Sequence, residues 1–76
     1  MNTQRDIYFS IQSNTCKYIR EHIETVTLCT IMDMIHKSCA DNHLSYEDET
    51  NITQTALGVY IVQCETHQVI PKTGLR

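Results

Sequence analysis

Glycine and proline are scarce in this 76-residue sequence, which contains two glycines, one proline and no tryptophan. Neither glycine nor proline occurs before residue 58. Glycine-rich loops cradle phosphates because only glycine lets the backbone approach so closely, so the sequence excludes a P-loop and a G-x-G-x-x-G dinucleotide site. It also offers no glycine-bearing turn that would present a catalytic nucleophile, and we therefore expect a protein that is not an enzyme.

Lysine and arginine are absent from residues 38–71, a segment that contains five acidic residues. The whole chain has six Lys and Arg residues against nine Asp and Glu residues, which gives a formal net charge of −3. A protein that binds nucleic acid needs clustered positive charge to displace counterions from phosphates. The sequence therefore predicts no direct contact with nucleic acid, and an acidic surface in its second half.

Long hydrophobic runs are also missing, because no apolar segment approaches the roughly 18 residues that a membrane span requires. The first residues do not lead into the hydrophobic region of a signal peptide. These features favour a cytoplasmic protein without a membrane contact. In that compartment four cysteines are expected to be reduced and to pack as small apolar side chains. They are Cys16, Cys29, Cys39 and Cys64.

Isoleucine, in contrast, recurs along a series of every fourth residue in the first half of the chain. The series includes Ile7, Ile11, Ile19, Ile23, Ile31 and Ile35. Spacings of three and four residues bring side chains to one side of an α-helix, whereas a half-buried strand repeats every two residues. The apolar face of residues 7–26 points away from that of residues 28–39, and the change falls at three consecutive β-branched residues, Thr25-Val-Thr27. The pattern predicts two helices with a kink or short break near Thr25, and the alternative is one continuous curved helix.

A further helix is predicted to begin after Ser45, a good N-cap residue followed by Glu47, Asp48 and Glu49. Acidic side chains in a first helical turn are stabilised by the positive end of the helix dipole. The predicted fold is therefore all-α, with helices over residues 4–24, 27–41 and 46–65. We expect one domain over residues 1–76, with residues 71–76 as a frayed tail. The alternative is an α+β fold with short strands near residues 6–12 and 58–70, because residues 58–63 are rich in β-branched and aromatic side chains.

Cysteine and histidine side chains supply the sharpest metal-like pattern, Cys39-x3-His43 followed by Cys64-x2-His67. Two thiolates and two imidazoles suit a tetrahedral zinc ion. A third helix would place the two halves at its opposite ends, about 30 Å apart. His36, Cys39 and His43 also share one helix face. We predict no metal and no cofactor, and a metal, thiol or pH sensor built on these residues remains the alternative function.

Four residues are the best candidates for contact with another protein. Phe9 projects away from the predicted core of the first helix, which suits a subunit contact. Glu47, Asp48 and Glu49 serve either as a solvated helix start or as a docking surface for a basic partner. The sequence thus favours a small cytoplasmic regulator, adaptor or inhibitor that acts by binding another protein. A chain this short has a marginal core of its own, so we also expect a homodimer.

The order of the three helices, with a break before Leu28, resembles the small AriR-type biofilm regulators of enteric bacteria. The resemblance covers residues 19–62 and includes the apolar ending Thr55-Ala-Leu-Gly-Val-Tyr-Ile-Val62. It contains no diagnostic motif, and the chain lacks the glycine that the family has between its first two helices. The resemblance implies an all-α dimer that acts in signalling, and it assigns no role to any residue of this chain.

Overall fold

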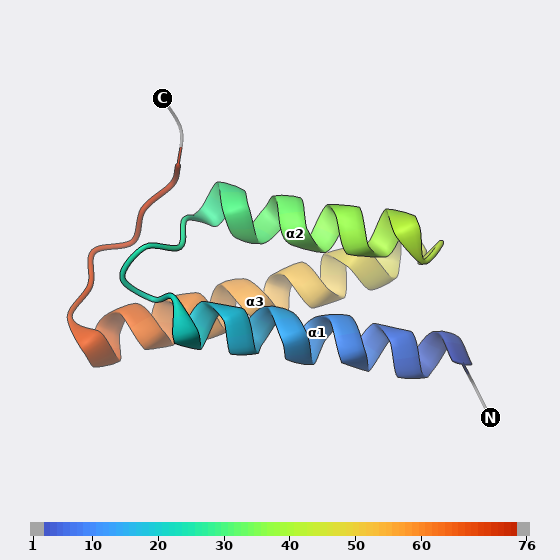
Figure 1. Ribbon diagram of the computed structural model, residues 1–76, viewed down its shortest axis with the longest axis horizontal. Helices are drawn as coiled ribbons and strands as arrows, with labels where there is room; N and C mark the ends of the chain where they lie inside the picture. The colour runs from blue at the N-terminus through green and yellow to red at the C-terminus, as the bar shows by residue number, and fades with distance from the viewer. Residues whose placement is uncertain (1–2, 75–76) are drawn as a thin grey trace.

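The computed structural model of the protein describes residues 3–74 and consists of three helices (Figure 1). They are α1 (Thr3–Glu21), α2 (Leu28–Asp41) and α3 (Tyr46–His67). The structure confirms the all-α prediction. The alternative with strands is wrong, since residues 6–12 lie within α1 and residues 58–67 lie within α3. In α3, packing against the other two helices outweighs the strand preference of its β-branched residues.

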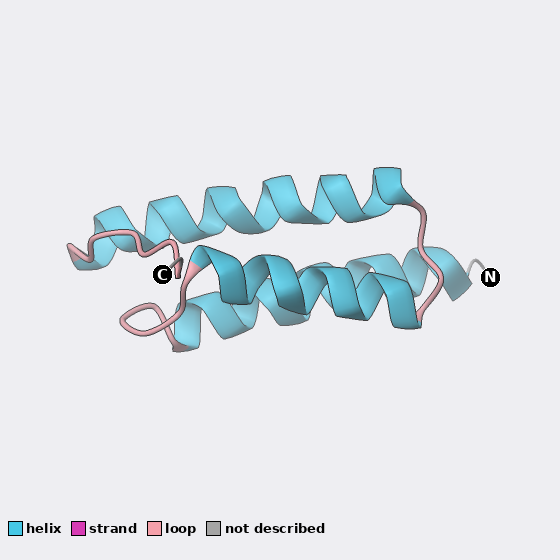
Figure 2. Ribbon diagram, turned by 90° about the horizontal axis from the view of Figure 1, so that it is seen from above, coloured by secondary structure: helices cyan, strands magenta, loops and turns pink. Residues whose placement is uncertain are grey.

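The helices form a small bundle in which α1 and α3 run in the same direction and α2 runs in the opposite direction (Figure 1). Helix α3 packs against both α1 and α2 (Figure 2). The starts of α1 and α3 therefore lie at the same end of the bundle. This arrangement brings residues near the start of the chain close to residues 48–51, and it positions the candidate site described below.

Isoleucine side chains from all three helices fill the core. Ile19, Ile31, Ile35 and Ile52 have no exposed surface, and Tyr60 is equally buried among them. These residues form one cluster with Cys39, Ala56 and Cys64. The isoleucine spacing therefore identified the core-facing sides of α1 and α2.

The break between the first two helices is confirmed, because α1 ends at Glu21 and α2 begins at Leu28. Val26 is buried in this connection and anchors it to the core. Thr27 is the N-cap of α2, and its Oγ1 accepts a hydrogen bond from the backbone N–H of Thr30 at 3.2 Å. The β-branched residues thus lie in the connection after α1, where Val26 is buried and Thr27 caps α2.

Ser45 caps α3 as the sequence predicts. Its Oγ accepts a hydrogen bond from the backbone N–H of Asp48 at 3.2 Å. Three acidic residues occupy the first turn of the helix that follows. The cap therefore satisfies one of the amide groups that have no partner within the helix.

Removing this cap is expected to destabilise the protein measurably. Ser45→Ala leaves the Asp48 amide without its acceptor and should lower the free energy of unfolding by about 1 kcal/mol. Urea unfolding should then show a lower midpoint with an unchanged slope. An unchanged midpoint would mean that water replaces the hydroxyl at no cost.

Residues 69–74 leave the end of α3 and return to the start of α2 (Figure 1). The backbone carbonyls of Lys72 and Thr73 accept hydrogen bonds from the N–H groups of Leu28 at 2.8 Å and Cys29 at 2.9 Å. The tail therefore caps the first turn of α2 next to the Thr27 side chain. These contacts argue against fraying of residues 72–74, whereas residues 75–76 lie outside the described residues.

The hydroxyl group of Tyr60 fastens the tail to the core. It donates a hydrogen bond to the carbonyl oxygen of Val26 at 3.3 Å and accepts one from the backbone N–H of Lys72 at 2.8 Å. Burial, the larger cause, and the neighbouring Cys64 raise the pKa of the Tyr60 phenol. The phenol thus remains protonated and able to donate at neutral pH.

Candidate protein-interaction surface

Two of the predicted interaction residues, Phe9 and Asp48, meet in space although they lie on different helices. They line one hollow of about 310 Å³, together with Gln4, Arg5, Tyr8 and Asn51. We call this feature the α1–α3 hollow. The first turns of α1 and α3 approach one another because the two helices are parallel. The sequence identified both residues, but it gave no sign that they share a site.

Aromatic side chains and one arginine form the α1 side of the hollow. The Phe9 side chain is 48% exposed, and its ring lies edge-on to that of Tyr8 with the centroids 5.2 Å apart. The guanidinium carbon of Arg5 lies 5.5 Å from the Phe9 centroid, within the range of a cation–π contact. Arg, Tyr and Phe are enriched at protein interfaces, so this side of the hollow has the composition of a binding surface.

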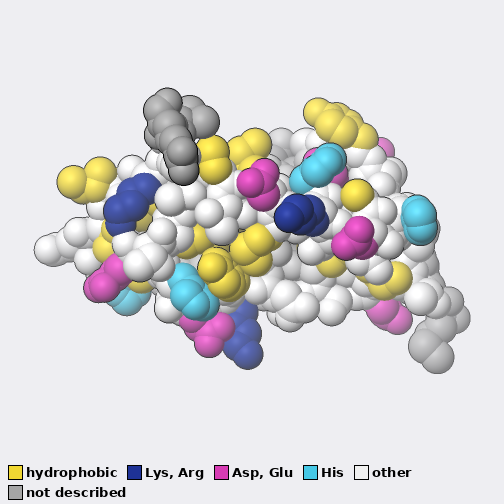
Figure 3. All heavy atoms as spheres, turned by 45° about the horizontal axis from the view of Figure 1, so that its top comes forward, with side chains coloured by type: hydrophobic (Ala, Val, Ile, Leu, Met, Phe, Trp, Pro, Cys, Tyr) yellow, Lys and Arg dark blue, Asp and Glu magenta, His cyan; other side chains and the backbone are white. Residues whose placement is uncertain are grey.

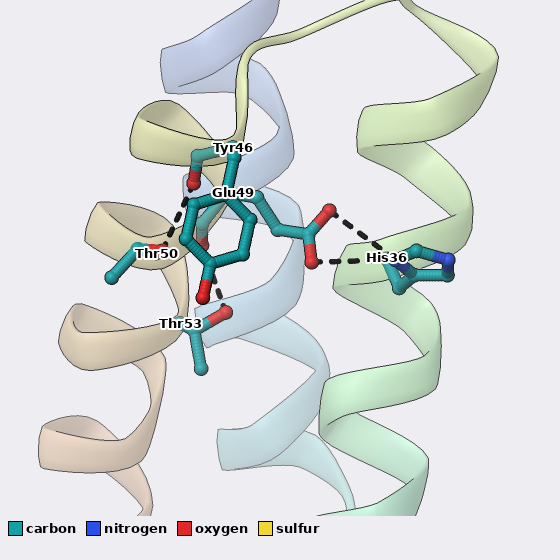
Figure 4. Close-up of polar contacts among 5 residues, drawn as sticks. All are labelled: His36, Tyr46, Glu49, Thr50 and Thr53. Atoms are coloured by element: carbon teal, nitrogen blue, oxygen red, sulfur yellow. Dashed lines mark hydrogen bonds and ion pairs between the residues drawn. The ribbon is translucent and has the colours of Figure 1, made fainter.

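The three predicted acidic residues do not act together. Asp48 lines the hollow and Glu47 is exposed, but Glu49 points toward α2 (Figure 4). Both carboxylate oxygens of Glu49 lie 3.3 Å from Nδ1 of His36. Only 27% of the Glu49 side chain is exposed. Glu49 therefore links α2 to α3, and the acidic part of the candidate surface reduces to Glu47 and Asp48.

A second hollow lies further along the same pair of helices. It measures about 410 Å³ and is formed by the following residues of α1 and α3: Arg20, Gln54, Thr55, Gly58, Val59, Val62 and Gln63. We call it the Gly58 groove. The sequence pattern did not predict it. The available signal was the single glycine inside a helix that has no charged residue between positions 50 and 64.

Gly58 has no structural role that explains its presence within α3. A Cβ atom added there would meet no other atom within 4 Å, apart from its immediate surroundings in the helix. Glycine inside a helix costs about 1 kcal/mol relative to alanine. The chain therefore bears a cost at Gly58 that its own packing does not offset.

The cysteines and histidines do not come together as a metal site. Cys39 lies near the end of α2, beside the start of α3, whereas Cys64 lies near the far end of α3. Among residues 3–74 no three His, Cys, Asp or Glu side chains are placed to hold a metal ion. Burial raises the pKa of the Cys39 thiol, and the charges of Glu49 and Asp48 raise it further. This thiol is therefore protonated at neutral pH, which opposes reaction as a nucleophile.

Elsewhere on the surface the exposed apolar side chains are scattered. On the face shown in Figure 3, hydrophobic side chains alternate with acidic, basic and histidine side chains. Met32 of α2 is 51% exposed and belongs to neither hollow. Over the described part of the chain, no helix has both the length and the apolar character needed to cross a membrane.

Comparison with protein families, with curated proteins and with solved structures finds no match to this chain. None of these comparisons supports the resemblance to AriR-type regulators.

Proposed function

We propose that this protein is a small, non-catalytic cytoplasmic regulator or adaptor that binds another protein through the α1–α3 hollow. The observation that supports this proposal is the meeting of Phe9 and Asp48. They are separated by 38 residues in the sequence, yet they line one exposed hollow. Such a surface offers a partner both an apolar anchor point and a charged rim.

The composition of the hollow favours a protein as the ligand. Most of the binding energy of an interface comes from a few Trp, Tyr or Arg side chains that become buried. Tyr8, Phe9 and Arg5 provide aromatic and guanidinium surface on one helical turn, and Phe9 is half exposed. Side-chain N and O atoms buried within residues 3–74 all have hydrogen-bond partners. The buried polar groups are therefore already paired within the fold, and the α1–α3 hollow is the surface that we propose binds the partner protein.

The role of Phe9 is tested by quantitative affinity capture from the organism that makes the protein. The parent protein, Phe9→Ala and a matched control, Met32→Ala, are immobilised, and the captured proteins are compared by mass spectrometry. Phe9 and Met32 are similarly exposed, at 48% and 51%. The proposal expects specific partners, or the protein itself, to be lost with Phe9→Ala and retained with Met32→Ala. Equal capture by all three forms would contradict it.

Neutralising the acidic rim is expected to slow association. The double variant Glu47→Gln with Asp48→Asn should bind a captured partner more slowly, whereas Glu49→Gln should bind at nearly the parent rate. The reason is that rim charges steer encounter, while Glu49 pairs with His36. Binding kinetics at low and high salt provide the measurement, since salt screens exposed charges and should mimic the double variant. Equal association rates at low salt would show that these acids only complement the helix dipole.

A further inference from the structure

The two hollows occupy matching positions along one face of the bundle. Both lie between α1 and α3, and each is lined by residues of both helices. Asp48 precedes Thr55 by seven residues and Val62 follows it by seven, which is about 10 Å along the helix axis in each direction. A two-fold rotation about an axis near Thr55 therefore exchanges the position of the α1–α3 hollow with that of the Gly58 groove.

The side chains that line the two hollows are also complementary in shape and charge. The α1–α3 hollow contributes a half-exposed aromatic ring, Phe9, and a carboxylate, Asp48. The Gly58 groove contributes the apolar side chains of Val59 and Val62, a position without a side chain at Gly58, and the guanidinium group of Arg20. Arg20 forms no ion pair within residues 3–74. Phe9 and Asp48 thus each have a complement in the other hollow, whereas Arg5, which also lines the α1–α3 hollow, has none there.

We infer that the partner is a second copy of this chain, paired through a two-fold axis near Thr55 so that the α1–α3 hollow of each copy covers the Gly58 groove of the other. This inference rests on the proposed function, because it names the partner of the same surface. In the pair, Phe9 of one copy lies over Gly58 and Val59 of the other. Asp48 of each copy faces Arg20 of its partner, and both contacts occur twice because the interface is isologous.

Charge selects the antiparallel arrangement of the two copies. Glu47 and Asp48 outnumber Arg5 at the end of the bundle where α1 and α3 begin, so an antiparallel pair brings this acidic end against the end that carries Arg20. A parallel pair would instead place Asp48 against Asp48, and like charges opposed across an interface weaken it. The inferred arrangement also explains why a glycine occurs at position 58. A residue without a side chain is unfavourable in an exposed helix, but it leaves room for a partner's aromatic ring.

The size of the protein is compatible with this interface. An interface of standard size removes about 800 Å² from each partner. That area is about 15% of the 5420 Å² surface of the single chain. The bundle is 41 Å long, so contacts on both sides of Thr55 fit within its length. A short chain with a small core gains most from covering such a face.

Sedimentation of the parent protein and of charge-reversed variants tests the inference. The parent protein at micromolar concentration should sediment with twice the mass of 8.8 kDa. Asp48→Lys alone and Arg20→Glu alone should each weaken the dimer at least about tenfold, because each places like charges opposite one another. The double variant should recover most of the affinity. Circular dichroism on each variant checks that the helices remain.

A second pair of variants tests the groove without altering charge. Gly58→Leu fills the groove and should abolish the dimer, whereas Met32→Leu on α2 should leave it unchanged. A dimer that survives Gly58→Leu, or single charge variants that the double variant does not rescue, would place the interface elsewhere and overturn the inference.

The outcomes separate this inference from the proposed function. A parent protein that stays at 8.8 kDa up to millimolar concentration overturns the self-pairing. If Phe9→Ala then still loses a foreign protein in affinity capture, the α1–α3 hollow remains a binding surface for that protein. A monomer whose capture is unaffected by Phe9→Ala would overturn both.

Discussion

Tyr60→Phe is expected to lower the free energy of unfolding by about 2–3 kcal/mol, although it removes a single oxygen atom. The loss leaves the carbonyl oxygen of Val26 without its donor and the N–H group of Lys72 without its acceptor. A buried polar group that loses its partner costs more than the hydrogen bond itself contributed. The tail should also be held less firmly at the start of α2, because the Lys72 amide loses its contact with the core, although Val69 still packs there.

Urea unfolding and hydrogen exchange together measure this effect. The unfolding midpoint should fall, and the Leu28 and Cys29 amides, which donate to Lys72 and Thr73, should exchange faster in the folded protein. Tyr46→Phe is the matched control, since Tyr46 is 83% exposed and its change should matter little. Equal midpoints for the two variants would contradict the role assigned to the Tyr60 hydroxyl.

Ile35→Ala is expected to cost about 2–5 kcal/mol, the largest effect among these predictions. Ile35 has no exposed surface and belongs to the cluster that joins the three helices. Its truncation removes apolar contacts and leaves a cavity that the surrounding helices close only in part. A chain of 76 residues has a total stability of about 4–11 kcal/mol, so the variant should be close to unfolding.

The same helix supplies the control for this prediction. Met32→Ala removes a side chain of similar size from a position that is 51% exposed, and it should change stability much less. Urea unfolding followed by circular dichroism compares the two variants with the parent protein. Similar losses for Ile35→Ala and Met32→Ala would contradict the assignment of the core.

Local signals explain why the helices were predictable from the sequence. The helix-capping hydroxyl of Ser45 and the β-branched residues around Thr25 act on their own neighbours. The repeat of isoleucine marks the side of each helix that must leave water. The predicted ends differ from the observed ends by at most three residues, because terminal turns depend on tertiary contacts as well.

Contacts between distant residues were not predictable in the same way. The tail binds α2 through the backbone carbonyls of Lys72 and Thr73, and backbone carbonyls occur at every residue. The residue type of Gly74 does fit this contact. Its φ angle is 81°, and a Cβ atom there would lie 2.6 Å from Oγ1 of Thr27. The pairing of Glu49 with His36 likewise joins two helices, and it removed one of three acids from the predicted surface.

The candidate site follows from the relative direction of α1 and α3. The sequence marked Phe9 as outward-facing and Asp48 as a first-turn acid, and both properties are local. Their meeting in one hollow depends on α1 and α3 being parallel and packed side by side, and the sequence pattern does not encode the packing. The Gly58 groove depends on the same packing. Only the structure therefore shows that this glycine, which weakens its own helix, lines a groove.

Photo-crosslinking in living cells tests the central claim, that the α1–α3 hollow binds another protein. A photoreactive phenylalanine analogue replaces Phe9 of α1 in one version of the protein and Met32 of α2 in another. The two positions are similarly exposed but lie on different helices. Illumination should yield discrete crosslinked products from position 9 and few from position 32. A product of twice 8.8 kDa would identify a second copy as the partner. Products from position 32 alone, or from neither position, would contradict the claim.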